Sequence, residues 1–224
     1  MPLLEKIMSV VAPHDCLICG HESKLVCDWC AHDAFPVLPS RCFRCKQITS
    51  DFAVCDKDKK HTRLRNVWVR TGYDGTAKQI LQVYKFERAR SAASVIAQAM
   101  DEALPYLDSK TLVVPVPTAT SRVRERGYDQ ALLLAREIAR SRRLAWSRAV
   151  TRVSQTRQVG SSRQKRIAQL KNSFLVVQPD MVKGQDVLLV DDVVTTGATL
   201  EAVTLALRQA GAKSVRALVF AQKQ

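Results

Sequence analysis

The chain has 224 residues, 46% of them hydrophobic, which is enough to bury the core of one large domain or of one domain with a small attachment. This composition excludes a disordered chain, and no run approaches the roughly 20 apolar residues that a membrane-spanning helix needs. The formal net charge of +14 favours an anionic partner, either a phosphorylated ligand or nucleic acid.

The first thirteen residues predict a short amphipathic helix, because Leu3, Leu4, Ile7, Met8 and Val11 stand at helical spacing. A signal peptide would need a longer apolar run and a small-residue cleavage site, and this segment shows neither. We therefore expect a cytoplasmic protein that does not insert into a membrane.

The cysteine spacing predicts metal binding in the first sixty residues. All seven cysteines precede residue 56, and six of them form C-x2-C pairs. The pairs Cys16/Cys19 and Cys27/Cys30 can complete one tetrahedral zinc site of four thiolates, because each pair bends a tight knuckle. Such a site keeps no open position, so we expect the zinc to be structural; redox-active thiols are the competing interpretation.

A second zinc site would need a fourth ligand beside Cys42, Cys45 and Cys55. Asp58 stands three residues after Cys55, where a fourth cysteine is expected, and His61 is close by. We favour His61, because an imidazole nitrogen suits zinc well, and we keep Asp58 and a decayed site as alternatives. The expectation is one or two structural zinc ions.

The polar segment "DKDKKHTRLR" predicts a domain boundary near its middle. We place an N-terminal helix and zinc-ribbon domain at 1–62 and a second domain at 63–224. In the second domain strands and helices alternate. The expected strands are 66–73, 111–117, 186–192 and 214–221, and the expected helices are 76–86, 89–104, 128–144 and 197–212. Continuous apolar strands separated by helices predict an α/β fold with a parallel sheet covered on both faces.

Basic residues are concentrated between residues 121 and 171, which hold 14 lysines and arginines but three acids. Arg122, Arg124 and Arg126 are expected on a loop that follows the strand 111–117, where guanidinium groups suit a pyrophosphate. A solvated helix face is the alternative interpretation of this charge.

The segment "VLLVDDVVTTGATL" predicts a ligand site at a strand end. A buried strand stops on Asp191 and Asp192, whose carboxylates can accept hydrogen bonds from vicinal sugar hydroxyls and suit a hydrated Mg²⁺. The turn after it, from Thr195 to Thr199, leads into a helix N-terminus, which is a ready site for phosphate. An acidic pair of the receiver or nucleotidase type is the alternative, and the immediate "TTGAT" argues against it.

The segment "VLLVDDVVTTGAT" resembles the phosphoribosyl-pyrophosphate (PRPP) motif of type I phosphoribosyltransferases. With the cysteine knuckles, "PVP", "RERG" and "YKF", it resembles the ComF family, in which a zinc ribbon precedes a type I phosphoribosyltransferase fold. The resemblance implies that Asp191 and Asp192 bind the ribose hydroxyls and that Lys85 reaches phosphate. It assigns the 5′-phosphate to the turn of Thr195, Thr196, Gly197, Ala198 and Thr199.

The family's loop pattern is matched in "QTRQVGSSRQKRIAQLKNSF", which contains Arg163 and Arg166. The resemblance implies that Arg124 and Arg126 act on the departing pyrophosphate, with Arg163 or Arg166 closing over the site. Two departures from the pattern are Asp129 in place of an asparagine and Asp58 in place of an eighth cysteine.

The function that the resemblance implies is pentosyl transfer from PRPP with Mg²⁺, by a phosphoribosyltransferase with an unidentified acceptor and a link to DNA uptake. The alternative is a non-catalytic sensor of PRPP or a nucleotide that binds single-stranded DNA and works with competence proteins. A zinc-ribbon adaptor with an inactive transferase domain is a third interpretation, against which the intact Asp191–Asp192 pair argues.

Overall fold

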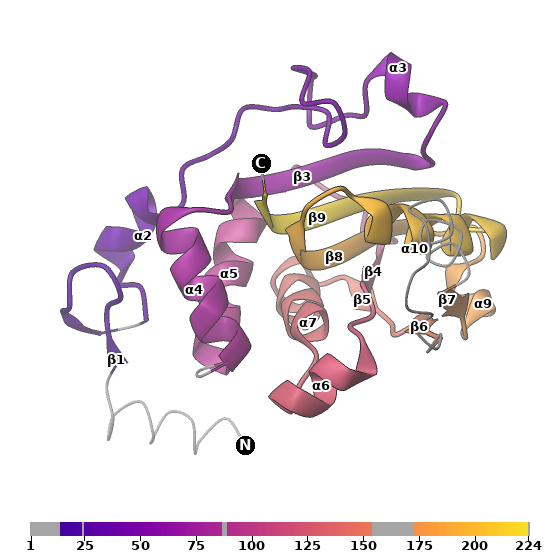
Figure 1. The fold of residues 1–224 in the computed structure, drawn as a ribbon. Helices are drawn as coiled ribbons and strands as arrows, with labels where there is room; N and C mark the ends of the chain where they lie inside the picture. Colours follow the sequence, from indigo (N-terminus) through magenta and orange to yellow (C-terminus); the bar gives the residue numbers. More distant parts are fainter. Residues whose placement is uncertain (1–13, 24, 87–88, 154–172, 224) are drawn as a thin grey trace, which may run out of the picture.

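A five-stranded sheet forms the centre of the protein (Figure 1). The structure is a computed structural model that describes residues 14–23, 25–86, 89–153 and 173–223. The strand order is β3 (Leu64–Gly72), β9 (Ser214–Gln222), β8 (Asp186–Val194), β4 (Leu112–Pro115) and β5 (Ala145–Trp146). Every neighbouring pair in this sheet is parallel, which confirms the predicted α/β fold class.

Strand β8 extends two residues beyond its expected end at Asp192. The reason is its pairing with β9, which continues from Asp191 opposite Val219 to Val194 opposite Gln222. On its other side β8 loses its partner earlier, because the last paired residue of β4 is Pro115, opposite Val190. The two acids therefore have a bonded strand on one side and a free edge on the other.

Helices cover both faces of the sheet. On one face lie α2 (Asp28–Ala34), α4 (Gly75–Phe86), α5 (Ala89–Glu102) and α7 (Gln130–Arg142), and on the other lie α9 (Pro179–Val182) and α10 (Ala198–Gln209). Successive strand side chains point to opposite faces, so Leu188 and Val190 join the first core while Val187 and Leu189 join the second. Both faces are thus buried, as the continuous apolar strands predict.

Several short elements were not predicted. Helix α6 (Thr120–Arg126) occupies the expected arginine loop, and strands β6 (Val150–Arg152) and β7 (Phe174–Val176) form an antiparallel pair. The segment between β6 and β7 includes 154–172, which holds Arg163 and Arg166 and lies outside the described residues, as does the expected helix before residue 14.

The cysteine-rich segment wraps around the β3 edge of the sheet, as the purple ribbon in Figure 1 shows. Its described elements are β1 (His14–Asp15), β2 (Glu22–Ser23), α2 and α3 (Asp56–Lys59). The Ala53 backbone pairs with Asn66 of β3, which covers that exposed edge. Phe35 belongs to the core on one face and Phe43 to the core on the other. The boundary at residues 62 and 63 stays a prediction.

Within the described ranges, no helix combines the length and the apolar character that crossing a bilayer requires.

Candidate functional site

A polar cavity lies beyond the carboxyl ends of β4 and β8. These strands are neighbours, but the chain continues from β4 to β5 on one side and from β8 to β9 on the other. Such a reversal of strand order opens a crevice where α/β proteins bind ligands. The cavity has a volume of about 420 Å³, within the range of small-molecule sites.

Two carboxylates from β8 line this cavity, Asp191 and Asp192. The Asp192 backbone N–H donates to Asp191 Oδ1 at 2.9 Å, and Lys85 Nζ lies 3.2 Å from Asp192 Oδ2. Burial and the neighbouring Asp192 carboxylate raise the pKa of Asp191 well above its usual value. The arrangement favours a ligand that brings hydroxyl donors or a cation to these oxygens.

The turn from Thr195 to Gly197 connects β8 to α10. Thr195 and Thr199 line the cavity, whereas the described lining does not include Thr196, Gly197 or Ala198. Gly197 is the N-cap of α10 and has a φ of 77°, a conformation that glycine adopts without strain. This places a helix N-terminus at the cavity, as the sequence predicts for phosphate binding.

The arginines of α6 face in different directions because they lie on a helix and not on a loop. Arg122 and Arg126 are four residues apart, so they share one side of α6, and both line the cavity. Arg124 is two residues from each and is not part of the described lining. Of the two arginines assigned to the pyrophosphate, the structure therefore brings Arg126 to the cavity and leaves Arg124 outside it.

Arg152 of β6 is a further arginine of the cavity that sequence reasoning missed. Burial lowers the pKa of its guanidinium, and the positive charge of Arg122 lowers it further. Two cations so placed favour an anionic ligand between them. The position of Arg152 follows from the pairing of β6 with β7, and the sequence gives no signal for that pairing.

Gln130 is a second functional candidate that the sequence did not single out. It is 3% exposed, its Oε1 accepts from Arg126 Nη1 at 2.7 Å, and its Nε2 is buried without a partner among the described residues. Tyr84 of the "YKF" segment donates to the Gln130 carbonyl at 2.6 Å and so ties α4 to α7. The sequence signal that could have found Gln130 is a polar residue among the apolar positions of the expected helix 128–144.

Asp129, the first departure from the family pattern, caps α7. Its Oδ1 accepts from the Leu132 backbone N–H at 3.3 Å and from Thr118 Oγ1 at 2.9 Å. Aspartate and asparagine are comparable N-caps, so this departure leaves the start of α7 intact.

The first cysteine cluster has the donor set and spacing of a structural zinc site. The sulfurs of Cys16, Cys19, Cys27 and Cys30 lie within 4.8 Å of one another. Cys19 and Cys27 are 3.8 Å apart, and a tetrahedral site with Zn–S bonds of about 2.3 Å has sulfurs about 3.8 Å apart. Burial would raise the pKa of Cys16, but hydrogen bonds from the backbone of Cys19, Cys27 and Ile18 bring it down to about 6.

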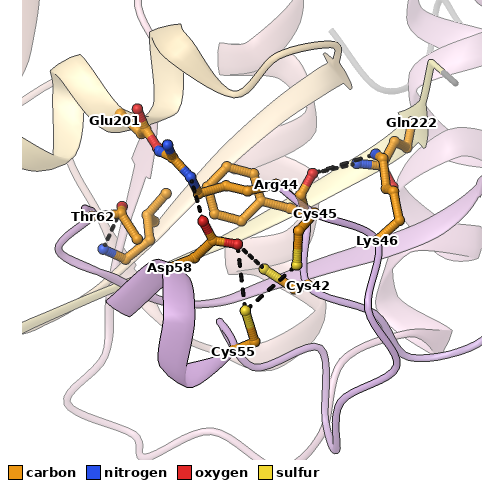
Figure 2. A network of polar contacts seen from close by, with 11 residues as sticks. Cys42, Arg44, Cys45, Lys46, Cys55, Asp58, Thr62, Glu201 and Gln222 are labelled. Carbon is orange, nitrogen blue, oxygen red and sulfur yellow. Dashed lines mark hydrogen bonds and ion pairs between the residues drawn. The ribbon is translucent and has the colours of Figure 1, made fainter. Parts of the chain in front are cut away.

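In the second cluster the structure places Asp58, and not the favoured His61, beside the three cysteines. Asp58 joins Cys42, Cys45 and Cys55 within 4.8 Å, with its Oδ2 at 3.3 Å from Cys42 Sγ and 3.4 Å from Cys55 Sγ (Figure 2). The reason is α3, for which Cys55 is the N-cap. Asp58 stands three residues later on the same side of this turn, whereas His61 follows the helix and is exposed.

Comparison with known proteins agrees with this architecture. Residues 128–224 match the family model of the phosphoribosyl transferase domain. DNA utilization protein YhgH of Salmonella typhimurium is 32% identical over 191 residues, which cover 82% of this chain and 77% of that protein. Competence protein ComFC of Bacillus subtilis is 26% identical over 196 residues, 83% of this chain and 79% of that protein. The chain belongs to the ComF family.

Competence protein F of Haemophilus influenzae is 33% identical to this ComF-family chain over 151 residues, which are 61% of this chain and 64% of that protein. Among solved structures, the allosteric regulatory enzyme of purine biosynthesis aligns over 57% of this chain and 25% of that chain, with a TM-score of 0.42 and 19% identity. The family model and the parallel sheet confirm a type I phosphoribosyltransferase fold preceded by cysteine clusters.

Proposed function

We propose that this protein binds PRPP together with Mg²⁺ and transfers the phosphoribosyl group to an acceptor in a process connected with DNA uptake. One observation carries the proposal: a single cavity gathers the β8 acids, Thr195 of the turn before α10, Thr199 of the first turn of α10, and arginines from α6 and β6. PRPP offers a diol, a terminal phosphate and a pyrophosphate, which are the groups that these side chains suit. The link to DNA uptake rests on relatives named for competence and DNA utilization.

Each part of the cavity has a proposed role. Asp191 and Asp192 accept hydrogen bonds from the ribose hydroxyls, and the start of α10, with Thr195 before it and Thr199 in its first turn, takes the 5′-phosphate through hydroxyls and helix N–H groups. The cavity-lining arginines hold the pyrophosphate, with Lys85 beside them. The roles of Thr196, Gly197 and Ala198 would be carried by backbone N–H groups at the start of α10, since these three residues are not part of the described lining.

Magnesium fits the donor set of this cavity, because carboxylate oxygens are the protein ligands that a hydrated Mg²⁺ prefers. Asp191 and Asp192 are the residues that would hold it. Bound there with PRPP, the ion would neutralise part of the charge on the pyrophosphate.

The transfer step exchanges one bond at the anomeric carbon of the ribose. A lone pair on an N–H or O–H acceptor forms the new bond, and the C–O bond to pyrophosphate breaks with its electron pair passing to the pyrophosphate. The proton of the acceptor is released to water. Arg122, Arg126 and Arg152 stabilise the negative charge that develops on the leaving group, which is where a preorganised site accelerates such a reaction.

Calorimetric titration with PRPP and Mg²⁺ tests the binding step. We expect the unaltered protein to bind and the double variant Asp191→Asn/Asp192→Asn to lose detectable binding, because the neutral amides no longer accept strongly from the diol or hold the cation. Asp180→Asn, which changes an exposed carboxylate on α9, is the control and should bind normally. An unchanged titration in the double variant would refute the assignment.

A screen for pyrophosphate release from PRPP separates an enzyme from a binding protein. Candidate bases, amines and single strands are offered as acceptors to the protein that binds PRPP. Release that depends on one acceptor class supports transfer and names that class. PRPP binding without release of pyrophosphate in the presence of any of these acceptors favours the non-catalytic alternative.

Single-strand binding is the second candidate function, and a specific surface favours it. A cavity of about 800 Å³ lies between α5, α7 and β5 and is lined by Arg136, Arg140 and Trp146. The Arg136 guanidinium lies 5.4 Å from the centroid of the Trp146 ring, which is 41% exposed. The lining also includes Glu137, which pairs with Arg140. Arginines beside an exposed aromatic ring are an arrangement on which unpaired bases stack.

A further inference from the structure

The second cysteine cluster is connected to the turn that leads into α10, and the proposed function does not explain this connection. Two consecutive residues between the metal ligands, Phe43 and Arg44, make the link. Each reaches α10 or its N-cap by a different kind of contact.

Arg44 bridges the cluster and the first turn of α10. Its Nε lies 3.2 Å from Asp58 Oδ1, and its Nη1 pairs with Glu201 (Figure 2). The other carboxylate oxygen of Asp58 faces the sulfurs of Cys42 and Cys55. One carboxylate therefore serves both the cluster and Arg44, in the manner of an outer-shell partner that orients a metal ligand.

Phe43 supplies the apolar contact. It is buried, and its ring lies so close to Gly197 that a Cβ added there would be 2.3 Å from Phe43 Cε2. The Phe43 carbonyl accepts from Gln222 Nε2 at 3.2 Å and from Lys46 Nζ at 3.3 Å. Because Gln222 pairs with Val194 at the end of β8, these bonds fix the ring against the turn from the strand side.

A bound cation would hold this geometry once the cysteines are thiolates. Three thiolates and a carboxylate within 4.8 Å of one another repel strongly when no positive charge lies between them. Their spacing fits zinc, since Cys45 Sγ and Cys55 Sγ are 3.5 Å apart and zinc-bound thiolates are about 3.8 Å apart. Loss of the ion would free Asp58 and, with it, Arg44.

We propose that zinc held by Cys42, Cys45, Cys55 and Asp58 fixes Phe43 and Arg44 against residues 195–201, so that occupancy of this cluster sets the order of the turn before α10. Arg44 and Phe43 are positioning residues in this scheme. The consequence for phosphate binding rests on the proposed function, whereas the coupling between cluster and turn does not.

Amide hydrogen exchange of residues 195–201, measured without PRPP, tests the coupling directly. We expect Arg44→Ala to keep two zinc ions per chain by elemental analysis and yet to exchange about tenfold faster in this segment, a size within the usual range of coupling between sites. Cys42→Ser should lose one zinc ion and show the same faster exchange. Arg41→Ala, which removes an exposed arginine of the same segment, should change neither quantity.

The first cluster supplies the control for zinc loss as such. Cys19→Ser should lose one zinc ion without faster exchange at 195–201, because Cys30 of this cluster packs against the core on the other face of the sheet. Unchanged exchange in both Arg44→Ala and Cys42→Ser would overturn the proposal. If Cys42→Ser does not fold, the exchange of residues 195–201 in Arg44→Ala decides, together with a partial return to normal exchange in Arg44→Lys.

A PRPP titration of the same variants separates the two proposals. Faster exchange with an approximately tenfold weaker PRPP affinity in Arg44→Ala supports both. If exchange is faster but the unaltered protein does not bind PRPP at all, the coupling between cluster and turn is supported and the proposal that PRPP is the ligand is refuted. If Arg44→Ala shows normal exchange and normal PRPP binding, the coupling is refuted and PRPP remains the proposed ligand.

Discussion

At the scale of single residues, Asp191 combines a useful chemistry with an unfavourable environment. Burial and the adjacent Asp192 carboxylate raise its pKa well above the usual value, so ionisation at neutral pH costs the folded state free energy. We expect Asp191→Asn to stabilise the ligand-free protein at pH 7, because the neutral amide does not carry the cost of a buried charge beside Asp192. Chemical denaturation in magnesium-free buffer measures this difference.

The pH dependence of that gain has a definite sign. The unaltered protein loses the full free energy of unfolding that Asp191 costs it at pH values above the raised folded-state pKa of Asp191. It loses none of it at pH values below the ordinary carboxyl pKa near 4. The advantage of Asp191→Asn should therefore be largest at neutral pH and shrink as the pH falls towards 4. A constant advantage, or one that grows on acidification, would contradict the explanation. Asp180→Asn is the control and should show no such trend.

The sequence predicted residues whose roles follow from their own chemistry and immediate neighbours. Asp191, Asp192 and the first four cysteines are of this kind, and the structure brings each set together. The sequence did not favour Asp58 over His61 as the fourth residue of the second cluster, because that choice depends on the single turn of α3. It also missed Gln130, whose unpaired amide nitrogen becomes apparent only when α6 and α7 are in place.

At the scale of elements, the change from a loop to helix α6 reassigns the arginines. We expect Arg122→Ala to weaken PRPP binding by about 10- to 100-fold, the loss of roughly 1.5–3 kcal/mol that a charge-assisted hydrogen bond carries. Arg124→Ala removes the same charge from the same helix but lies outside the cavity lining, so it is a matched control and should have little effect. The same calorimetric titration measures both.

Equal losses in the two variants would mean that the charge of α6 matters and its orientation does not, which would contradict the assignment of Arg122. The sequence held a signal for this helix. Gly127 has a φ of 78° and ends α6, and a glycine after a turn rich in basic residues is typical of a helix C-terminus. The arginines were expected on a loop because they follow the strand 111–117.

At the scale of the whole molecule, the parallel sheet was predictable and the path of the cysteine-rich segment was not. Continuous apolar strands separated by helices specify burial on both faces, because their side chains alternate. The segment that holds the cysteines divides its apolar residues between the two faces, with Phe35 on one and Phe43 on the other. Such contacts join positions far apart in the chain, and local periodicity contains no information about them.

The uneven charge of the molecule leads to a prediction about single-stranded DNA. Arginines gather around the β5 edge, where Arg136 and Arg140 line the groove beside Trp146. We expect a labelled single strand to bind with an affinity that falls steeply with salt, because each neutralised phosphate releases counterions. Fluorescence anisotropy at several salt concentrations gives the slope of log affinity against log salt.

Variants of this groove separate charge from stacking. Arg136→Ala with Arg140→Ala should reduce the steepness of that slope by about 1.4, since each phosphate contact on a single strand contributes about 0.7. Trp146→Ala should leave the slope unchanged and cost about 1–3 kcal/mol, the contribution of one stacked base. Arg65→Ala removes an exposed arginine from β3, at the opposite edge of the sheet, and should change neither. A flat salt response in the unaltered protein, or no binding at low salt, would exclude this surface as a nucleic-acid site, and the positive charge would then serve the PRPP cavity alone.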